Sequence, residues 1–253
     1  MFLIAVSGLD GPEEELARTL AAALGKTPYE MRSRARAPRG GPTVVGTYGD
    51  GDAAEAVAAK LRAAGLSVII DTPEAVTGAW ERIVGRRIEL DGGVALEDRA
   101  GVRYEVPPGD VQVLLSGVGH WTETRTETQT TRQFSAGRAI LSGGLMVTRK
   151  TTTERVTTAQ GGDRFLVVYL ARRCYLLRET EMQYTGLGDL MEASRTANFL
   201  VVQRELLARC TAAVHDDRLL TRAGQLQVLG PAFPPEDHVE LAAALVARTL
   251  GAG

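Results

Sequence analysis

The chain has 253 residues, of which 44% are hydrophobic and 24% charged, so it can bury a core in one large or two small domains. This composition excludes wholesale disorder, and the net charge of −2 argues against a generally basic nucleic-acid-binding protein. Two isolated cysteines and an apolar start too short for a signal-peptide core predict a cytoplasmic protein.

The first seventy residues carry strand and helix patterns in the order β-α-α-β-α-β. Leucines at every fourth position from Leu16 predict the first helix, and Thr27 followed by proline is typical of the start of a second. An alanine-rich run predicts the third helix, with Asp50 and Asp52 in the turn that caps it. The expected strands are 2–6, 43–47 and 66–70.

The next part of the chain is dominated by strand patterns separated by glycine and proline turns. After a connector at 72–84, strands are expected at 86–90, 94–97, 102–106, 111–116, 164–171 and 174–179, with a short one at 182–185. Ser194 is expected to cap a helix with Phe199, Val202 and Leu206 on one face. Asp216 and Asp217 are expected at a frayed helix end, followed by a strand at 226–229 and a final helix at 239–250.

These patterns predict an α+β fold class. Residues 1–72 form a small α+β module, 73–83 a linker, and 84–215 a β-barrel or sandwich domain that ends in a helix. A long threonine-rich β-arm is inserted at 119–163, and 216–253 form a C-terminal extension with a helix.

The first module resembles the C-terminal domain of the bacterial ribosomal stalk protein and the ClpS adaptor fold. The order of elements, the helix link at Leu24–Met31 and the helix and strand start at Ala53–Leu66 carry the resemblance. It implies binding of other proteins through exposed helices. The stretch matching the adaptor's recognition loop, Ser7–Asp10, keeps one Asp and no His, so recognition of destabilising N-terminal residues is not expected.

Residues 84–213 resemble a bacterial pleckstrin-homology-like (PH-like) domain, in which short strands are followed by one amphipathic helix that closes the open end of a barrel. Strand count and the final helix carry this resemblance. It implies binding of lipid, peptide or protein and does not specify which.

The insertion holds the most unusual pattern of the chain. From Trp121 to Gln133, threonines alternate with charged and polar residues, and a second threonine-rich stretch runs from Val147 to Thr158. Threonine favours extended backbone, so a two-stranded arm is expected, with a disordered segment as the alternative. Residues 121–158 contain six basic and three acidic residues, a net charge of +3.

The two polar stretches flank an apolar segment, which is the predicted partner-binding site. Large apolar side chains of this kind are rarely left in water, so we expect them to be covered by the parent domain or by a partner. The candidate residues are Phe134, Arg138, Ile140, Leu141, Leu145, Met146 and Val147.

Catalytic, cofactor and metal motifs are not recognised. Gly25-Lys26-Thr27 lacks the preceding glycine of a phosphate-binding loop, and the three histidines lack ligand spacing. The basic run Arg32, Arg34, Arg36 and Arg39 is interpreted as a solvated helix face, with contact to an acidic partner or a phosphate backbone as the alternative.

The sequence therefore predicts a non-enzymatic cytoplasmic interaction or scaffold protein. It would bind a protein partner or a second copy of itself through the apolar tip of the arm, with no cofactor, and nucleic acid is not expected. Two alternatives stay open. One is peripheral binding to anionic membranes through the PH-like domain and the basic arm; the other is an enzyme with a site between domains.

Overall fold

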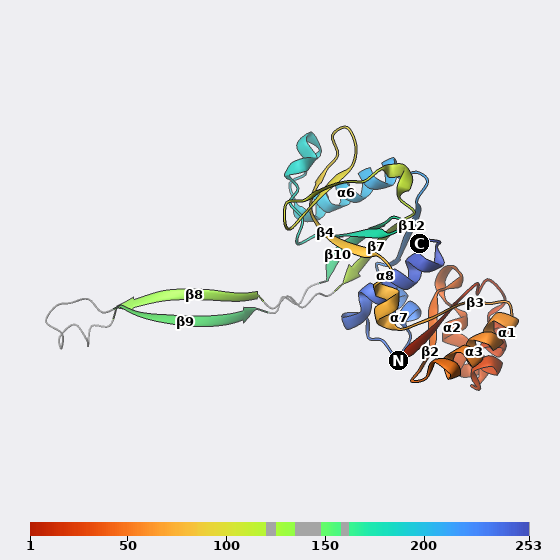
Figure 1. The fold of residues 1–253 in the computed structure, drawn as a ribbon. Helices are drawn as coiled ribbons and strands as arrows, with labels where there is room; N and C mark the ends of the chain where they lie inside the picture. Colours follow the sequence, from red (N-terminus) through yellow and green to blue (C-terminus); the bar gives the residue numbers. More distant parts are fainter. Residues whose placement is uncertain (120–124, 135–147, 158–161, 253) are drawn as a thin grey trace. The chain divides into compact units, whose positions relative to one another are not determined.

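The computed structural model describes residues 1–119 and 162–252, and the backbone of strands 125–134 and 148–157. The chain divides into two compact units, one formed by 1–119 with 162–253 and the other by 120–161. The described strands form a three-stranded, a seven-stranded and a two-stranded sheet (Figure 1). The predicted mixed α+β class is therefore confirmed.

The N-terminal module has the predicted order of elements. Its antiparallel sheet has the strand order β2-β1-β3, and every central residue of β1 is buried, so both faces of this sheet are covered. Ile4 and Val6 pack with Leu20 and Leu61 of the helices on one face. The elements are β1 (Phe2–Ser7), α1 (Glu13–Leu24), α2 (Pro28–Ala35), η1 (Pro38–Gly40), β2 (Thr43–Tyr48), α3 (Gly51–Ala63) and β3 (Ser67–Asp71).

Local capping explains where these helices begin. The Thr27 hydroxyl accepts a hydrogen bond from the Glu30 amide, and the Glu30 carboxylate accepts one from the Thr27 amide at 2.8 Å, which is a complete capping box. The Asp50 carboxylate accepts a hydrogen bond from the Ala53 amide at 3.1 Å. The predicted caps are confirmed, and Asp50 serves helix α3.

The seven-stranded sheet has the order β12-β7-β10-β11-β4-β5-β6. The pairs β12–β7 and β11–β4 are parallel and the others antiparallel. Among the described strands it is an open sheet with β12 and β6 at its edges, not a closed barrel. Its strands are β4 (Glu81–Glu89), β5 (Ala95–Asp98), β6 (Arg103–Glu105), β7 (Val113–Gly119), β10 (Asp163–Tyr169), β11 (Arg173–Arg178) and β12 (Val214–Leu219).

Helices cover both faces of this sheet. On one face, Phe199 and Leu206 of α6 (Arg195–Arg209) join a core with Leu114, Leu166 and Tyr175 of the strands. On the other, α8 (Pro235–Thr249) packs on β7, while α7 (Arg222–Leu229) packs on α8 and on β2 of the N-terminal module. The pair α7 and α8 therefore lies between the two sheets (Figure 1). The remaining short helices are α4 (Pro73–Thr77), η2 (Pro108–Asp110) and η3 (Thr185–Leu190).

Three predicted elements in the second half of the chain are wrong. The expected strand at 226–229 is the end of helix α7, which starts at the N-cap Thr221. A short apolar run fits either structure, and packing between two sheets selects the helix. The expected strand at 182–185 forms one isolated bridge, between Gln183 and Arg87. Asp216 and Asp217 are not at a frayed helix end but in strand β12.

The basic run is only in part the predicted solvated face: Arg32, Arg36 and Arg39 are exposed, whereas Arg34 is half-buried, and three of the four arginines make intramolecular contacts. The Arg34 guanidinium donates hydrogen bonds to the carbonyls of Leu226 at 3.1 Å and Gln227 at 3.3 Å, in the last turn of α7. Arg39 forms ion pairs with Asp216 at 3.0 Å and Asp217 at 2.6 Å. Exposed Arg36 pairs with Glu13 at 2.6 Å, and Arg32 is exposed.

The unit formed by 120–161 contains the two-stranded sheet. Strand β8 (Arg125–Phe134) pairs antiparallel with β9 (Thr148–Thr157), from Arg125 opposite Thr157 to Phe134 opposite Thr148. The predicted pairing of the two threonine-rich stretches is confirmed. We call β8 and β9 the hairpin.

Candidate functional site

The insertion leaves and re-enters the seven-stranded sheet at neighbouring positions. Strand β7 ends at Gly119, β10 starts at Asp163, and these two residues lie directly opposite each other in the antiparallel pair. A long segment can be accommodated at such a position without changing the strands on either side, because its ends are already close together. We call Gly119 and Asp163 the root of the insertion.

Asp163 is held firmly at this root. Its side chain is 6% exposed, and its carboxylate accepts hydrogen bonds from the Thr180 amide at 3.0 Å, the Thr180 hydroxyl at 2.6 Å and Arg178 Nε at 3.2 Å. Buried carboxylates are tolerated only when their oxygens are satisfied in this way. The start of β10 is therefore fixed to the end of β11.

A second buried carboxylate extends this network. Glu181 forms ion pairs with Arg178, with Arg99 at 2.6 Å and with Arg86 at 3.5 Å. Burial alone would raise the pKa of Glu181, but the hydrogen bond from Arg99 and the charge of Arg178 outweigh it and lower the pKa. The carboxylate is ionised at neutral pH and joins β4, the β5–β6 turn and β11 beside the root.

The predicted partner-binding residues fall mostly beyond the described part of the chain. Phe134 is the last residue of β8, and its backbone is paired with Thr148. The register makes 135–147 the connection between the two hairpin strands. Arg138, Ile140, Leu141, Leu145, Met146 and Val147 all belong to this connection and lie outside the described residues.

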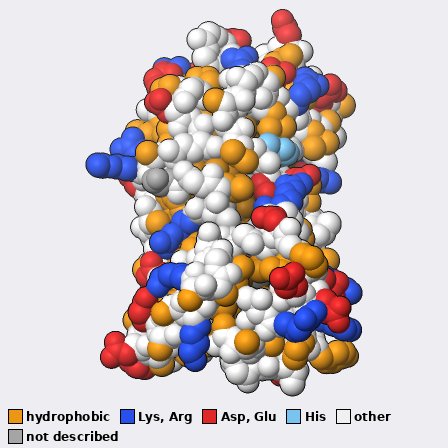
Figure 2. Space-filling view, turned by 90° about the vertical axis from the view of Figure 1, so that its right-hand side faces the viewer, with side chains coloured by type: hydrophobic (Ala, Val, Ile, Leu, Met, Phe, Trp, Pro, Cys, Tyr) orange, Lys and Arg blue, Asp and Glu red, His pale blue; other side chains and the backbone are white. Residues whose placement is uncertain are grey.

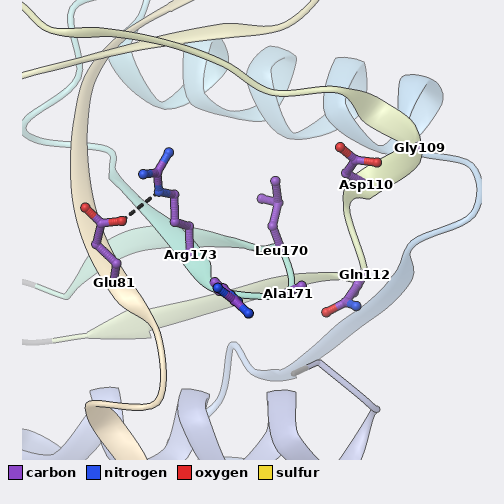
Figure 3. A pocket seen from close by; sticks show the side chains of 8 residues that line it. Glu81, Gly109, Asp110, Gln112, Leu170, Ala171 and Arg173 are labelled. Atoms are coloured by element: carbon purple, nitrogen blue, oxygen red, sulfur yellow. Dashed lines mark hydrogen bonds and ion pairs between the residues drawn. The ribbon is translucent and has the colours of Figure 1, made fainter.

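A hollow of about 650 Å³ lies at the turn that joins β10 to β11 (Figure 3). Arg173 Nε contacts a Glu81 carboxylate oxygen at 2.6 Å, Asp110 comes from η2, and exposed Arg172 lies in the turn itself. Leu170 adds an apolar wall. Carboxylates and guanidinium groups together suit binding of a polar ligand that carries both positive and negative charge. Sequence reasoning missed this hollow because its lining comes from three separate segments.

The structure also brings together polar residues that the sequence analysis left apart. His215 Nε2 lies 3.3 Å from the Ser116 hydroxyl, which accepts a hydrogen bond from Gln203 Nε2 at 3.0 Å. Ser116 is only 2% exposed. The contacts satisfy a hydroxyl on the face of β7 that α6 covers, and its burial denies a substrate access to the oxygen.

Neither thiol is activated. Cys174 and Cys210 are free and buried, and burial raises the pKa of Cys174 to about 11 and also raises the pKa of Cys210. A buried thiol of this kind carries little thiolate at neutral pH. Across 1–119 and 162–252, His, Cys, Asp and Glu form no cluster of three that could hold a metal ion.

The surface shown in Figure 2 mixes charges of both signs. Acidic and basic side chains lie next to each other there, with hydrophobic side chains between them. In the described residues, no helix combines the length and the apolar character needed to traverse a bilayer.

Comparison of the chain with protein-family models, curated proteins and solved structures found no match.

Proposed function

We propose that this chain is a cytoplasmic interaction protein whose hairpin contacts a partner protein. The observation that carries the proposal is the pairing of β8 and β9 into a two-stranded sheet of their own, in a compact unit separate from the rest of the chain. A two-stranded hairpin is marginally stable alone in water, so a partner surface would supply the missing stabilisation. The two free thiols fit a reducing compartment.

The connection at 135–147 supplies the contact chemistry. Five large apolar residues follow Phe134 there, and each contributes about 1.5–3 kcal/mol when fully buried. The partner surface would therefore be largely apolar. Arg138 in the same segment adds one cation that an acidic group at the rim of that surface can pair with.

The PH-like likeness belongs to this proposal as well. Strands β4 to β7, β10 and β11 precede one helix, α6, whose apolar face packs on them. This order supports a PH-like domain in residues 84–213, with the insertion carried between two of its strands. The two opposed residues of the root, Gly119 and Asp163, support the hairpin as an addition to that domain.

The experiment compares two charge-matched double variants. Ile140→Asp with Leu141→Asp places two carboxylates on apolar positions, while Ser135→Asp with Ser142→Asp adds the same charge to the same segment at polar positions. For both variants and for the wild type, we would identify the proteins that each captures from cells and measure its mass in solution by light scattering. We expect the first variant to lose contacts that the control keeps. Equal masses and equal captured proteins for all three would refute the proposal.

Liposome flotation separates the membrane alternative. The +3 charge of residues 121–158 would give binding that increases with anionic lipid, by about 1 kcal/mol for each cation near the surface. Flotation that depends on anionic lipid and is lost in the Ile140→Asp/Leu141→Asp variant, while protein capture is unaffected, would replace the protein partner by a lipid surface.

A further inference from the structure

The two larger sheets have four edge strands, β2, β3, β6 and β12. An edge strand presents unpaired backbone N–H and C=O groups, and proteins protect such edges with charges, bulges, short strands or covering elements. The four edges differ in this protection.

Three of them carry a recognisable protective feature. Helix α7 packs on β2, and the Thr43 hydroxyl donates a hydrogen bond to the Gln227 carbonyl at 2.5 Å. Strand β12 has a register shift between Asp216 and Leu219 and is rich in charged residues. Strand β6 is three residues long and has a charged residue at each end. None of the three offers a long, regular edge.

Strand β3 has the weakest protection: helix α3 packs on it, but it has no register shift and its only charged residue is Asp71 at its end. Its sequence, Ser67-Val-Ile-Ile-Asp71, has three β-branched apolar residues in a row, all partly exposed. Its register with β1 runs through five residue pairs without a shift, so the strand is regular along its whole length. In an antiparallel pair, alternate residues turn both backbone groups away from the partner strand, so β3 directs hydrogen-bonding groups outward.

We propose that β3 pairs with β3 of a second copy of this chain, antiparallel and centred on Ile69. The two three-stranded sheets then become one six-stranded sheet across a two-fold axis. Ile69 lies opposite its own copy, Val68 opposite Ile70, and Ser67 opposite Asp71. Apolar residues thus meet apolar residues, and no two like charges are opposed.

Charge favours β3 of a second copy as the pairing strand, and it favours the antiparallel direction over the parallel one. A parallel arrangement would place Asp71 opposite Asp71, and like charges directly opposite each other are unfavourable. In the antiparallel arrangement Asp71 faces a neutral serine, and its carboxylate is paired with Arg248 of its own chain at 3.2 Å. The strand is therefore complementary to itself in one direction only.

The test uses the one exposed position of the strand, Ser67, so that folding is not disturbed. Analytical ultracentrifugation of the full chain over a concentration series should show a species of twice the 27.1 kDa chain mass. Ser67→Asp places a carboxylate opposite Asp71 at two symmetric positions, and we expect it to raise the dimer Kd roughly 2- to 30-fold. Ser67→Lys places an ammonium there and should lower the Kd.

The two Ser67 variants place opposite charges at the same position facing Asp71, so a difference between their dimer Kd values is specific to the proposed register. A monomer at every concentration, or the same Kd for both Ser67 variants, would overturn the proposal. The Ile140→Asp/Leu141→Asp variant should leave this dimer unchanged, so failure of the β3 proposal and failure of the hairpin proposal can be told apart. Circular dichroism and the melting temperature establish that each variant is folded.

Discussion

Replacing Asp216 by asparagine tests a buried ion pair of strand β12 whose members also contact the N-terminal module. The side chain is 2% exposed and accepts hydrogen bonds from Arg218 Nε at 2.9 and 3.0 Å, from Arg218 Nη2 at 2.7 Å and from the Arg218 amide at 3.0 Å. Arg39 adds an ion pair at 3.0 Å. Arg218 in turn donates to the carbonyls of Gly41 and Pro38, so the contact joins β12 to the turn before β2.

The expected loss is large because the partner charge stays buried. The Asp216→Asn change keeps the shape but leaves the guanidinium of Arg218, itself 3% exposed at the side chain, without its counter-charge. Removing one partner of a buried pair costs about 3–5 kcal/mol of unfolding free energy. Asp217→Asn is the control, because its carboxylate is 46% exposed and an exposed pair contributes about 0–1 kcal/mol.

The unfolding free energy lost in Asp216→Asn should also depend on pH. Burial would raise the pKa of Asp216, but hydrogen bonds from Arg218 and Arg39 outweigh it and lower the pKa below its ordinary value. The stabilisation is therefore complete above the unfolded-state pKa of about 3.9 and is lost as the pH falls through the lower folded-state pKa. The difference between the wild type and Asp216→Asn should be constant from pH 7 to 5 and should narrow below about pH 4.

Urea denaturation followed by circular dichroism measures both quantities. The unfolding free energy of the wild type, Asp216→Asn and Asp217→Asn is compared at pH 7, 5 and 3.5. A loss below 1 kcal/mol for Asp216→Asn at pH 7, or a loss that is equal at pH 7 and 3.5, would refute the reasoning.

The remaining predictions concern packing and thiol reactivity. A methyl group added at Gly117 would overlap the Phe165 ring, so Gly117→Ala should destabilise the fold by about 1–3 kcal/mol in the same denaturation assay. Gly93→Ala, where no atom lies within 4 Å, should change stability little; similar effects of the two changes would contradict the packing argument. At pH 8, Cys174 and Cys210 should react slowly with a thiol reagent in the native protein and rapidly after denaturation. Rapid reaction of a native thiol would show that one of them is accessible.

Capping and turn residues predicted the N-terminal module well, because these interactions are local. Thr27 with Glu30, and Asp50 with Ala53, satisfy helix termini within four residues of chain, and no distant contact competes with them. The pairing of the threonine-rich stretches was predictable for the same kind of reason, since β-branched residues favour extended backbone wherever they lie.

The candidate sites were harder to predict from the sequence. The hollow beside Arg173 and the cluster around Glu181 join residues from separate strands and turns, and nothing in their spacing along the chain marks them. The position of β3 at a sheet edge could be recognised only once the strand order was known, because an edge strand and a central strand have similar apolar runs. The membership of Asp216 in a strand depends on its pairing with Leu115 in β7.

By itself, the sequence determined the α+β class, the order of the N-terminal elements and the two paired stretches of the insertion, since propensity, capping and periodicity act over a few residues. Only the tertiary structure decided that α7 is a helix, that the C-terminal helices lie between two sheets, that Arg34 contacts α7, and that Arg39 contacts β12. Those outcomes depend on burial and on neutralising buried charge, and both are properties of residues that meet across nearly two hundred positions of the chain.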